Sequence, residues 1–271
     1  MDYFKRSLKG KKTSSLSWSS FLSFYTYNAV DYVAKWVTEH VGGKPMVDDE
    51  VLLQGVKLFE TQMNAATDFS SKVAVAKDII RWAGDSFGDQ LVMSTSFGLQ
   101  SAVLLHLASQ VRKDIPVIWI DTGYLPVETY QYAMHLKKHL GLNVKIYQSD
   151  VSPTHMESLY GKLWESKDPT ERRLYGLMRK VMPMKRAHGE LNARCMLVGL
   201  RSNQTEHRSQ LPALEQPEDE NSQTCKLYPM LNWSKEDIDE YFVLHNLPQH
   251  PLVQQGYTSV GDSHSSRPKT A

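Results

Sequence analysis

The sequence predicts an α/β fold with a doubly wound, mostly parallel sheet, and two observations indicate this class. The chain has 271 residues, 41% of them hydrophobic and 23% charged, which is enough for one large α/β domain or two small ones. From residue 90 onward, short apolar or β-branched runs alternate with helical patterns. Strands that alternate with helices form a parallel sheet, because each helix returns the chain to the same end of the sheet.

Three helices are predicted before the first strand. Apolar residues on one helical face of AVDYVAKWVTEHV indicate a helix within an N-terminal extension over residues 1–48. The runs DEVLLQGVKLFETQMNAA and SSKVAVAKDIIRWAGDSF predict two more, the second with a serine near its start as a cap. The main domain is therefore expected over residues 49–271.

Strands and crossover helices follow in turn. The predicted strands are LVMSTS, PVIWIDT, NVKIYQSD and RCMLVGL, and the helices between them include QSAVLLHLASQV and PVETYQYAMHLKKHLG. The run SKEDIDEYFVLHN predicts an amphipathic helix capped by Ser234. A tail marked by proline and glycine, LPQHPLVQQGYTSVGDSHSSRPKTA, comes after it.

Composition and charge argue against several classes of protein. A net charge of +1 creates no global field for nucleic acid or an acidic membrane, and no apolar run is long enough to span a bilayer. Two cysteines, Cys195 and Cys225, suit a reducing compartment. His188, His207, His245 and His250 show no paired spacing for a metal. We expect the protein to be cytoplasmic, and to bind no metal, nucleic acid or membrane. Organelle targeting is the alternative, because the first twenty residues are basic and rich in serine.

The turn after the first predicted strand is the first candidate site. Backbone N–H groups at a helix start are unpaired and carry partial positive charge, so this turn could hold a phosphate. Its amides and hydroxyls belong to Ser94, Thr95, Ser96, Gly98 and Ser101. The alternative is a connection that uses serine only as a helix cap. Neither a G-x-G-x-x-G turn nor a G-x-x-x-x-G-K-[ST] loop occurs, which argues against the common nucleotide motifs.

Two more strand ends carry polar residues. Asp121, Thr122 and Gly123 end the second strand, where ligands of open α/β sheets bind. Asp121 could instead cap the helix after Pro126. Arg201 follows the fourth strand directly and is the best candidate for an anion ligand within a cationic stretch. Such scattered charges otherwise mark a solvated helix face.

Six motifs occur in a fixed order: STSFGLQSAV, IDTGYLPVETY, YGKLWE, KVMPMKRAHGELN, VGLRSNQTEHRSQLP and GYTSVGDSHSSRP. Together they resemble the motifs of the assimilatory phosphoadenylyl-sulfate (PAPS) reductase family, over residues 50 to 268 approximately. The resemblance implies an adenine nucleotide α-hydrolase-like fold. Its opening turn would be a modified pyrophosphatase (PP) loop that holds the phosphosulfate end of 3′-phosphoadenosine 5′-phosphosulfate.

The resemblance also implies a thiol reaction in sulfate assimilation and cysteine biosynthesis. A cysteine thiolate attacks the sulfate sulfur, adenosine 3′,5′-bisphosphate leaves, and thioredoxin releases sulfite from the S-sulfocysteine. Related iron-sulfur enzymes, which use adenosine 5′-phosphosulfate, carry cysteines where this chain has Tyr175-Gly176 and Asp262 to Ser265. We therefore expect no iron-sulfur cluster, no bound cofactor and a 3′-phosphorylated substrate. Relatives often pair, so a homodimer is compatible with this assignment.

The expected substrate-binding residues combine the strand ends with the family motifs. They are Ser94, Thr95, Ser96, Phe97, Gly98, Ser101, Asp121, Thr122, Gly123, Lys180, Arg186, Arg201, Arg208, Gly256, His264 and Arg267. One departure concerns selectivity: Ser202 stands where the family commonly has a second arginine, and Glu206 beside Arg208 would repel phosphate. Trp164 is expected either to pack in the core or to lie near the ligand.

A second departure concerns the nucleophile. The family's cysteine lies in a Glu-Cys-Gly-Leu-His segment near the C-terminus, and this sequence stops at Ala271, before that segment would begin. Cys195 is expected to be buried in a strand, and Cys225 precedes the strand-like KLYPML run, so neither is expected to replace it.

Three hypotheses follow. The chain is a reductase shortened at its C-terminal lid, or a non-catalytic protein that binds adenylylated sulfate, or an ATP-using PP-loop enzyme that adenylates a substrate. Adding the lid should restore sulfite production only under the first, and release of pyrophosphate from ATP would favour the third. The Ser-Gly-Gly-x-Asp-Ser turn of the third class is missing, with Phe97 at its smallest position.

Overall fold

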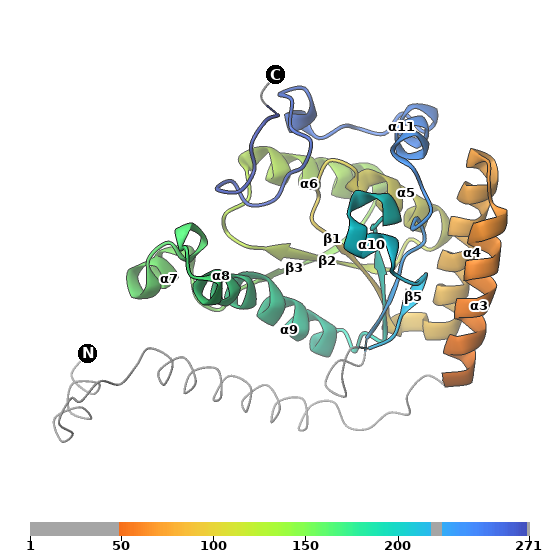
Figure 1. Cartoon of the computed structure of the whole chain (residues 1–271), viewed down its shortest axis with the longest axis horizontal. Helices are drawn as coiled ribbons and strands as arrows, with labels where there is room; N and C mark the ends of the chain where they lie inside the picture. The colour runs from red at the N-terminus through yellow and green to blue at the C-terminus, as the bar shows by residue number, and fades with distance from the viewer. Residues whose placement is uncertain (1–48, 218–223, 270–271) are drawn as a thin grey trace. The chain divides into compact units, whose positions relative to one another are not determined.

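The computed structural model describes residues 49–217 and 224–269, and these form a sheet with helices on both faces (Figure 1). The predicted helix over 29–41 and the extension over 1–48 lie outside the described residues. The strands are β1 (Leu91–Thr95), β2 (Pro116–Asp121), β3 (Asn143–Gln148), β4 (Cys195–Val198), β5 (Leu214–Glu215) and β6 (Cys225–Leu227). Their order in the sheet is β3-β2-β1-β4-β6-β5, and every neighbouring pair is parallel except β5 with β6. The predicted doubly wound, mostly parallel sheet is confirmed.

The helices occur where the sequence pattern changes to a period of 3.6 residues. They are α3 (Asp49–Ala65), α4 (Phe69–Phe87), α5 (Ser101–Val111), α6 (Val127–Leu140), α7 (Pro153–Tyr160), α8 (Pro169–Gly176), α9 (Met182–Glu190), α10 (Glu206–Ser209) and α11 (Lys235–Leu244). Among the described helices, none is long and apolar enough to cross a membrane.

The central strands bury both faces, which is why they are apolar throughout. In β1, Leu91 and Met93 join the large core formed with α4, α5 and α6, whereas Val92 joins a smaller core under α9. The same alternation occurs in β4, where Leu197 and Met196 face opposite cores. A period of two in side-chain direction therefore places helices on both faces of the sheet.

The strand order reverses between β1 and β4. The chain runs from β1 outward to β2 and β3, and later returns to place β4 on the other side of β1. Ligands of open α/β sheets bind at such a switch point, outside the carboxyl ends of the strands. In this chain those ends lead into the turn after Thr95 and the turn that contains Arg201.

A wide helical turn joins α8 to α9. Residues Leu177–Val181 form a π-helix, in which the Met182 amide donates to the Leu177 carbonyl. Pro183 gives the physical reason, because it has no N–H to donate to the carbonyl of Arg179. The turn carries Arg179 and Lys180, and sequence periodicity did not predict it.

Two predicted helix caps have different outcomes. Ser234 caps α11 as predicted, since its Oγ accepts the Asp237 amide at 3.1 Å. The predicted serine cap of α4 is wrong: Asp68 is the cap, and its carboxylate accepts the Ser71 amide at 2.9 Å. Aspartate and serine satisfy a helix start equally well, so the sequence pattern alone did not separate Asp68 from Ser70.

Candidate functional site

The turn after β1 has a fixed and unusual backbone. Phe97 has a positive φ of 49°, and its amide donates to Thr95 Oγ1 at 3.1 Å. Its side chain is fully buried and meets the ring of Trp119 edge-on at 5.0 Å. A non-glycine residue in this conformation is strained, and burial of the ring compensates for the strain. If Phe97 contacts a ligand, as predicted, it can therefore do so only through its backbone.

The amides that precede α5 are free to bind an anion. The N–H groups of Gly98, Leu99 and Gln100 make no hydrogen bond with any described residue. They precede an eleven-residue helix, whose dipole adds partial positive charge at this end. The turn can therefore hold a phosphate or sulfate through its backbone.

The hydroxyls of the turn are partly committed to its own structure. Ser101 Oγ donates to the Gly98 carbonyl at 2.8 Å, and Thr95 Oγ1 accepts from the backbone. Ser94 is half-buried and Ser96 is exposed. The alternative of a serine helix cap is contradicted, because Gln100 is the N-cap and makes no side-chain cap bond.

Arg201 lies at the adjacent strand end and is 6% exposed. Its Nη2 donates to Gln100 Oε1 at 2.9 Å, which links it to the turn after β1, and its Nη1 donates to Asn203 Oδ1 at 3.0 Å. Both acceptors are neutral, and no carboxylate of the described residues forms an ion pair with it. Burial lowers the pKa of Arg201 from its ordinary value, as expected for a poorly solvated charge.

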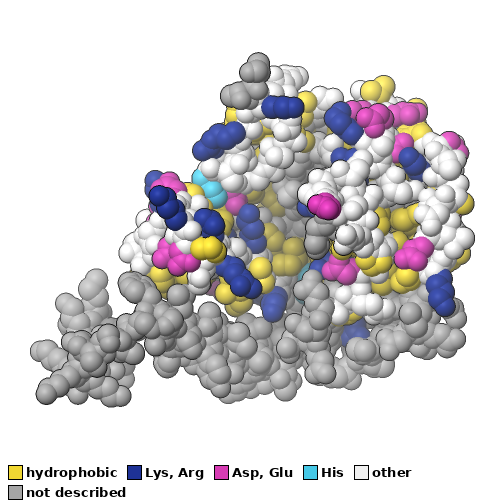
Figure 2. Space-filling model, viewed as in Figure 1, with side chains coloured by type: hydrophobic (Ala, Val, Ile, Leu, Met, Phe, Trp, Pro, Cys, Tyr) yellow, Lys and Arg dark blue, Asp and Glu magenta, His cyan; other side chains and the backbone are white. Residues whose placement is uncertain are grey.

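The surface around these strand ends is concave. Figure 2 shows a hollow between the C-terminal segment, α9 and α10, with Lys and Arg side chains on its rim. The C-terminal segment approaches the turn after β1 closely, because a Cβ added to Gly98 would lie 3.5 Å from the Val260 carbonyl oxygen. The same segment is held to the loop after β2, where the Ser263 amide donates to the Tyr124 carbonyl at 2.7 Å.

Asp121 lies at the end of β2 and is buried. Its carboxylate accepts hydrogen bonds from the Gly123 amide at 2.8 Å, Tyr130 Oη at 2.6 Å and Gln148 Nε2 at 2.6 Å. The alternative that it caps the helix after Pro126 is wrong, since α6 has no side-chain cap. These contacts indicate that Asp121 shapes the loop, and binding of a ligand by its carboxylate stays a prediction.

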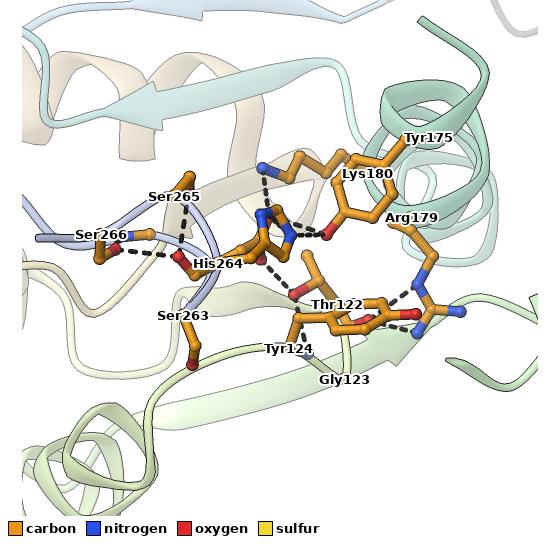
Figure 3. A network of polar contacts seen from close by, with 12 residues as sticks. Thr122, Gly123, Tyr124, Tyr175, Arg179, Lys180, Ser263, His264, Ser265 and Ser266 are labelled. Carbon is orange, nitrogen blue, oxygen red and sulfur yellow. Dashed lines mark hydrogen bonds and ion pairs between the residues drawn. The ribbon is translucent and has the colours of Figure 1, made fainter. Parts of the chain in front are cut away.

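Figure 3 shows Thr122, Tyr175 and Lys180 close to the C-terminal segment at His264. Asp262 joins this segment to the loop after β2, to α8 and to the π-helical turn. Its side chain is 2% exposed and accepts from the Thr122 hydroxyl, from Tyr175 Oη at 2.9 Å and from Lys180 Nζ at 2.8 Å. Burial raises the pKa of Asp262, but the hydrogen bonds from Lys180 and Thr122 outweigh burial, so its pKa is below the ordinary value. The predicted ligand Lys180 is thus half-exposed and already paired with a carboxylate.

His264 lies beside this carboxylate, within a group of aromatic rings. Its imidazole stacks on Trp164 with 4.6 Å between the ring centres and 11° between the planes. Its Nε2 lies 3.0 Å from Tyr175 Oη, and Tyr124 meets the imidazole edge-on at 5.7 Å. Trp164 packs against the buried cluster of Met156, Leu163 and Tyr175, as one of the two expectations has it, and it also stacks on His264. Contact between Trp164 and a ligand stays a prediction.

Arg179 is buried and stabilises the loop after β2 through hydrogen bonds to its backbone. It is 2% exposed, and its guanidinium donates to the carbonyls of Thr122 and Val151. Gly123 has a positive φ of 75°, and a Cβ there would lie 2.8 Å from Arg179 Nη2 and 2.7 Å from Pro153 Cγ. Glycine is therefore required at this position by both conformation and space.

Four further predicted residues lie in other surroundings. Arg186 pairs with Asp150 and Glu190 beside β3, and Arg208 donates to Gln204. Arg267 is exposed and donates to carbonyls of its own segment at Ser263 and Ser266. Gly256, with a φ of 80°, turns the C-terminal segment, whose ends meet through a bridge between Tyr257 and Pro268. For these residues, ligand contact stays a prediction.

Sequence reasoning did not predict roles for Asp262, Tyr175 or Arg179. The first two were noted only as positions where related enzymes have cysteines, and the structure brings these two positions into contact through the bond from Tyr175 to Asp262. The available signal was the acid in GDSH together with the aromatic-rich YGKLWE motif. Neither signal indicated a partner across 87 residues of sequence.

Both cysteines are buried in the sheet. Cys195 is fully buried in β4 and lies opposite Cys225 of β6, which is 2% exposed. Burial raises the pKa of the Cys195 thiol well above its ordinary value. Neither thiol therefore has the exposure of a reactive nucleophile, as expected from the sequence.

Comparison with known proteins identifies relatives along most of the chain. A family model described as phosphoadenosine phosphosulfate reductase domain matches residues 90–268. A phosphoadenosine 5′-phosphosulfate reductase of Synechococcus sp. is 51% identical over 207 residues, covering 76% of this chain and 88% of that protein. Another from Synechocystis sp. is 53% identical over 198 residues, covering 73% and 78% respectively.

Solved structures agree with this relationship. A phosphoadenylyl-sulfate reductase from Candida auris, in a phosphate complex, is 27% identical with a TM-score of 0.65, covering 83% of this chain and all of that one. The FMN adenylyltransferase of Candida glabrata, 16% identical over 83% of this chain and 76% of that one with a TM-score of 0.52, shares the fold alone. The fold is thus adenine nucleotide α-hydrolase-like, and the chain belongs to the phosphoadenosine phosphosulfate reductase family.

Proposed function

We propose that this chain binds 3′-phosphoadenosine 5′-phosphosulfate for its reduction to sulfite and adenosine 3′,5′-bisphosphate. The observation that supports the proposal most strongly is Arg201. A buried guanidinium with only neutral partners is costly, and an anion bound at its free N–H groups would compensate for that cost. Arg201 contacts Gln100, so such an anion would also meet the free amides of the turn after β1.

The proposal divides the ligand between two places. The phosphosulfate end lies on the amides of Gly98, Leu99 and Gln100, with Arg201 opposite. The remainder of the nucleotide contacts Lys180, His264 and the partly exposed residues of the C-terminal segment. Arginine suits this task because its N–H groups match the geometry of phosphate oxygens.

The chemistry proposed for the family's thiol is a transfer of the sulfo group. A thiolate attacks the sulfur, so that an S–S bond forms while the S–O bond to the 5′-phosphate breaks and adenosine 3′,5′-bisphosphate leaves. The dithiol of thioredoxin then attacks the S-sulfocysteine, supplies two electrons, becomes a disulfide and releases sulfite. The described residues bind and orient the nucleotide, and the cationic turn stabilises the leaving phosphate. Cys195 and Cys225 take no part.

The same proposal includes three properties that the family resemblance suggests. The chain works without an iron-sulfur cluster, because no thiolate is present at Tyr175 or in the segment from Asp262 to Ser265. It acts in the cytoplasm with thioredoxin as electron donor. It forms a homodimer, which light scattering of the purified chain would test.

Calorimetric titration with three nucleotides tests the ligand. We expect adenosine 3′,5′-bisphosphate to bind at least about tenfold more tightly than adenosine 5′-monophosphate, since one well-placed charged hydrogen bond contributes about 1.5–3 kcal/mol. ATP should bind more weakly than the bisphosphate. Tighter binding of ATP, with release of pyrophosphate, would contradict the proposal and favour an adenylating enzyme.

Sulfite release tests the reaction. The chain is assayed with 3′-phosphoadenosine 5′-phosphosulfate and reduced thioredoxin, both as printed and with the family's Glu-Cys-Gly-Leu-His segment joined to its C-terminus. We expect sulfite from the extended chain and none from a control extension in which serine replaces the added cysteine. If the extended chain binds the bisphosphate but releases no sulfite, the binding role remains and the reductase role is wrong.

A further inference from the structure

The hydroxyl of Tyr175 lies between two groups and has a single proton. Tyr175 Oη donates to Asp262 Oδ2 at 2.9 Å and lies 3.0 Å from His264 Nε2. Because the proton is used toward the carboxylate, the oxygen can only accept from the imidazole. The proton of a neutral His264 ring is therefore on Nε2, and Nδ1 has a free lone pair.

His264, Tyr175 and Asp262 form a chain of two hydrogen bonds, which we call the relay. The direction of donation along it depends on the ionised state of Asp262. The carboxylate is held by Lys180 Nζ at 2.8 Å and by the Thr122 hydroxyl, and these contacts favour its charged form despite burial. An ionised carboxylate has no proton to donate. The order of donation is consequently fixed, from His264 to Tyr175 to Asp262.

The orientation of the His264 ring is fixed as well. Trp164 stacks against one face of the imidazole, and Tyr124 approaches it edge-on. A ring flip would exchange Nε2 for carbon at the Tyr175 hydroxyl and lose that hydrogen bond. Nδ1 makes no hydrogen bond with any described residue, so it remains available to a ligand.

We propose that Tyr175 is a positioning residue that acts through His264, presenting Nδ1 to the anionic nucleotide so that ligand binding draws a proton from solvent onto that nitrogen. The inference rests on the proposed function, since it requires a phosphate or sulfate beside His264. The proton that moves is taken from the buffer, and the resulting imidazolium donates from both ring nitrogens, to the ligand and to Tyr175. No covalent bond changes.

The charges around His264 favour this response. In the free chain, burial lowers its pKa, as do Lys180 and Arg267, while Asp262 and Glu165 act in the opposite direction. The net pKa is below its ordinary value, so the ring is mostly neutral at pH 7. A phosphate group with up to two negative charges nearby would reverse the balance, because an opposite charge at about 4–6 Å favours the cationic form.

The first test follows His264 by nuclear magnetic resonance of its ring nitrogens and ring protons, with His264→Gln to assign the signals. In the free chain we expect the Nε2–H tautomer. On saturation with adenosine 3′,5′-bisphosphate we expect the pKa of His264 to rise by about one unit or more. An Nδ1–H tautomer in the free chain, or a pKa that the bound ligand leaves unchanged, would overturn the inference.

The second test is a double-mutant cycle measured by calorimetry in buffers of different ionisation enthalpy. Tyr175→Phe removes only the hydroxyl. We expect Tyr175→Phe and His264→Gln each to weaken bisphosphate binding by roughly fivefold to tenfold, and the double variant to bind no more weakly than His264→Gln alone. At pH 7 the wild-type chain should take up more protons on binding than the His264→Gln variant does. The uptake by Tyr175→Phe should be smaller than in the wild-type chain and close to that of His264→Gln.

Tyr241→Phe is the matched control, because Tyr241 Oη is also buried and bonds to a histidine, His106 Nδ1, at 2.9 Å. It should leave binding and proton uptake unchanged. Additive effects of Tyr175→Phe and His264→Gln would overturn the relay while leaving the proposed function intact. If the wild-type chain binds no bisphosphate at all, the proposed function fails and the inference fails with it.

Discussion

Replacing Arg201 with glutamine is expected to weaken binding of adenosine 3′,5′-bisphosphate by about 30- to 150-fold, the equivalent of roughly 2–3 kcal/mol. Arg201 is 6% exposed, and among the described residues its guanidinium donates only to the side-chain oxygens of Gln100 and Asn203. A charge in such a site interacts strongly with an anion, because little water screens it. Calorimetric titration of the variant measures the loss directly.

The stability of the Arg201→Gln variant separates a binding role from a structural one. Removing a buried charge that has no carboxylate partner among the described residues also removes its desolvation cost. We therefore expect the ligand-free variant to unfold at the same temperature as the wild-type chain or higher. Arg179→Gln is the contrasting case, since that guanidinium donates to two backbone carbonyls and its loss should lower the unfolding temperature.

Two further variants control for charge. Arg201→Lys keeps the charge but not the paired N–H groups, and it should recover only part of the affinity. Arg81→Gln removes an exposed arginine that pairs with Asp78, and it should leave affinity unchanged. Unchanged affinity in Arg201→Gln, with a clear loss of stability, would contradict the assignment of Arg201 as an anion ligand.

The strands and the switch point could be predicted from sequence because their signals are local. Apolar runs such as PVIWIDT and RCMLVGL are long enough to identify buried parallel strands, and alternation with helices fixes their direction. The positions of Arg201 and of Ser94 to Ser101 then follow from chain order, since each lies at or shortly after the end of a strand. No long-range contact has to be known to place them at the same edge of the sheet.

The contacts of Asp262 could not be predicted, because they depend on how distant segments pack. Thr122 lies 140 residues away in sequence and Tyr175 lies 87 residues away. The π-helical turn that carries Lys180 also leaves no periodic pattern in the sequence, and only Pro183 indicates it. Charge type was likewise insufficient, since Arg186 and Arg201 look alike in sequence but differ in burial and in their carboxylate partners.

Substituting alanine for Gly123 is expected to lower the free energy of unfolding by about 3 kcal/mol. A left-handed φ of 75° costs a residue with a Cβ about 1 kcal/mol, and the clash with Pro153 and Arg179 adds about 2 kcal/mol. Displacement of Arg179 would also loosen its bonds to the Thr122 carbonyl, so bisphosphate affinity should fall as well. Urea denaturation measures the first effect and calorimetry the second.

Gly141→Ala isolates the conformational part of this cost. Gly141 ends α6 with a φ of 65°, and a Cβ there would meet nothing within 4 Å. The control should therefore lose only about 1 kcal/mol and retain full affinity, because it pays for the left-handed backbone without a clash. Equal losses in the two variants would mean that the loop after β2 relaxes around the added methyl group. In that case Arg179 would not hold the loop rigidly, and the placement of Thr122 would depend on its hydrogen bonds with Asp262 and the Tyr124 amide.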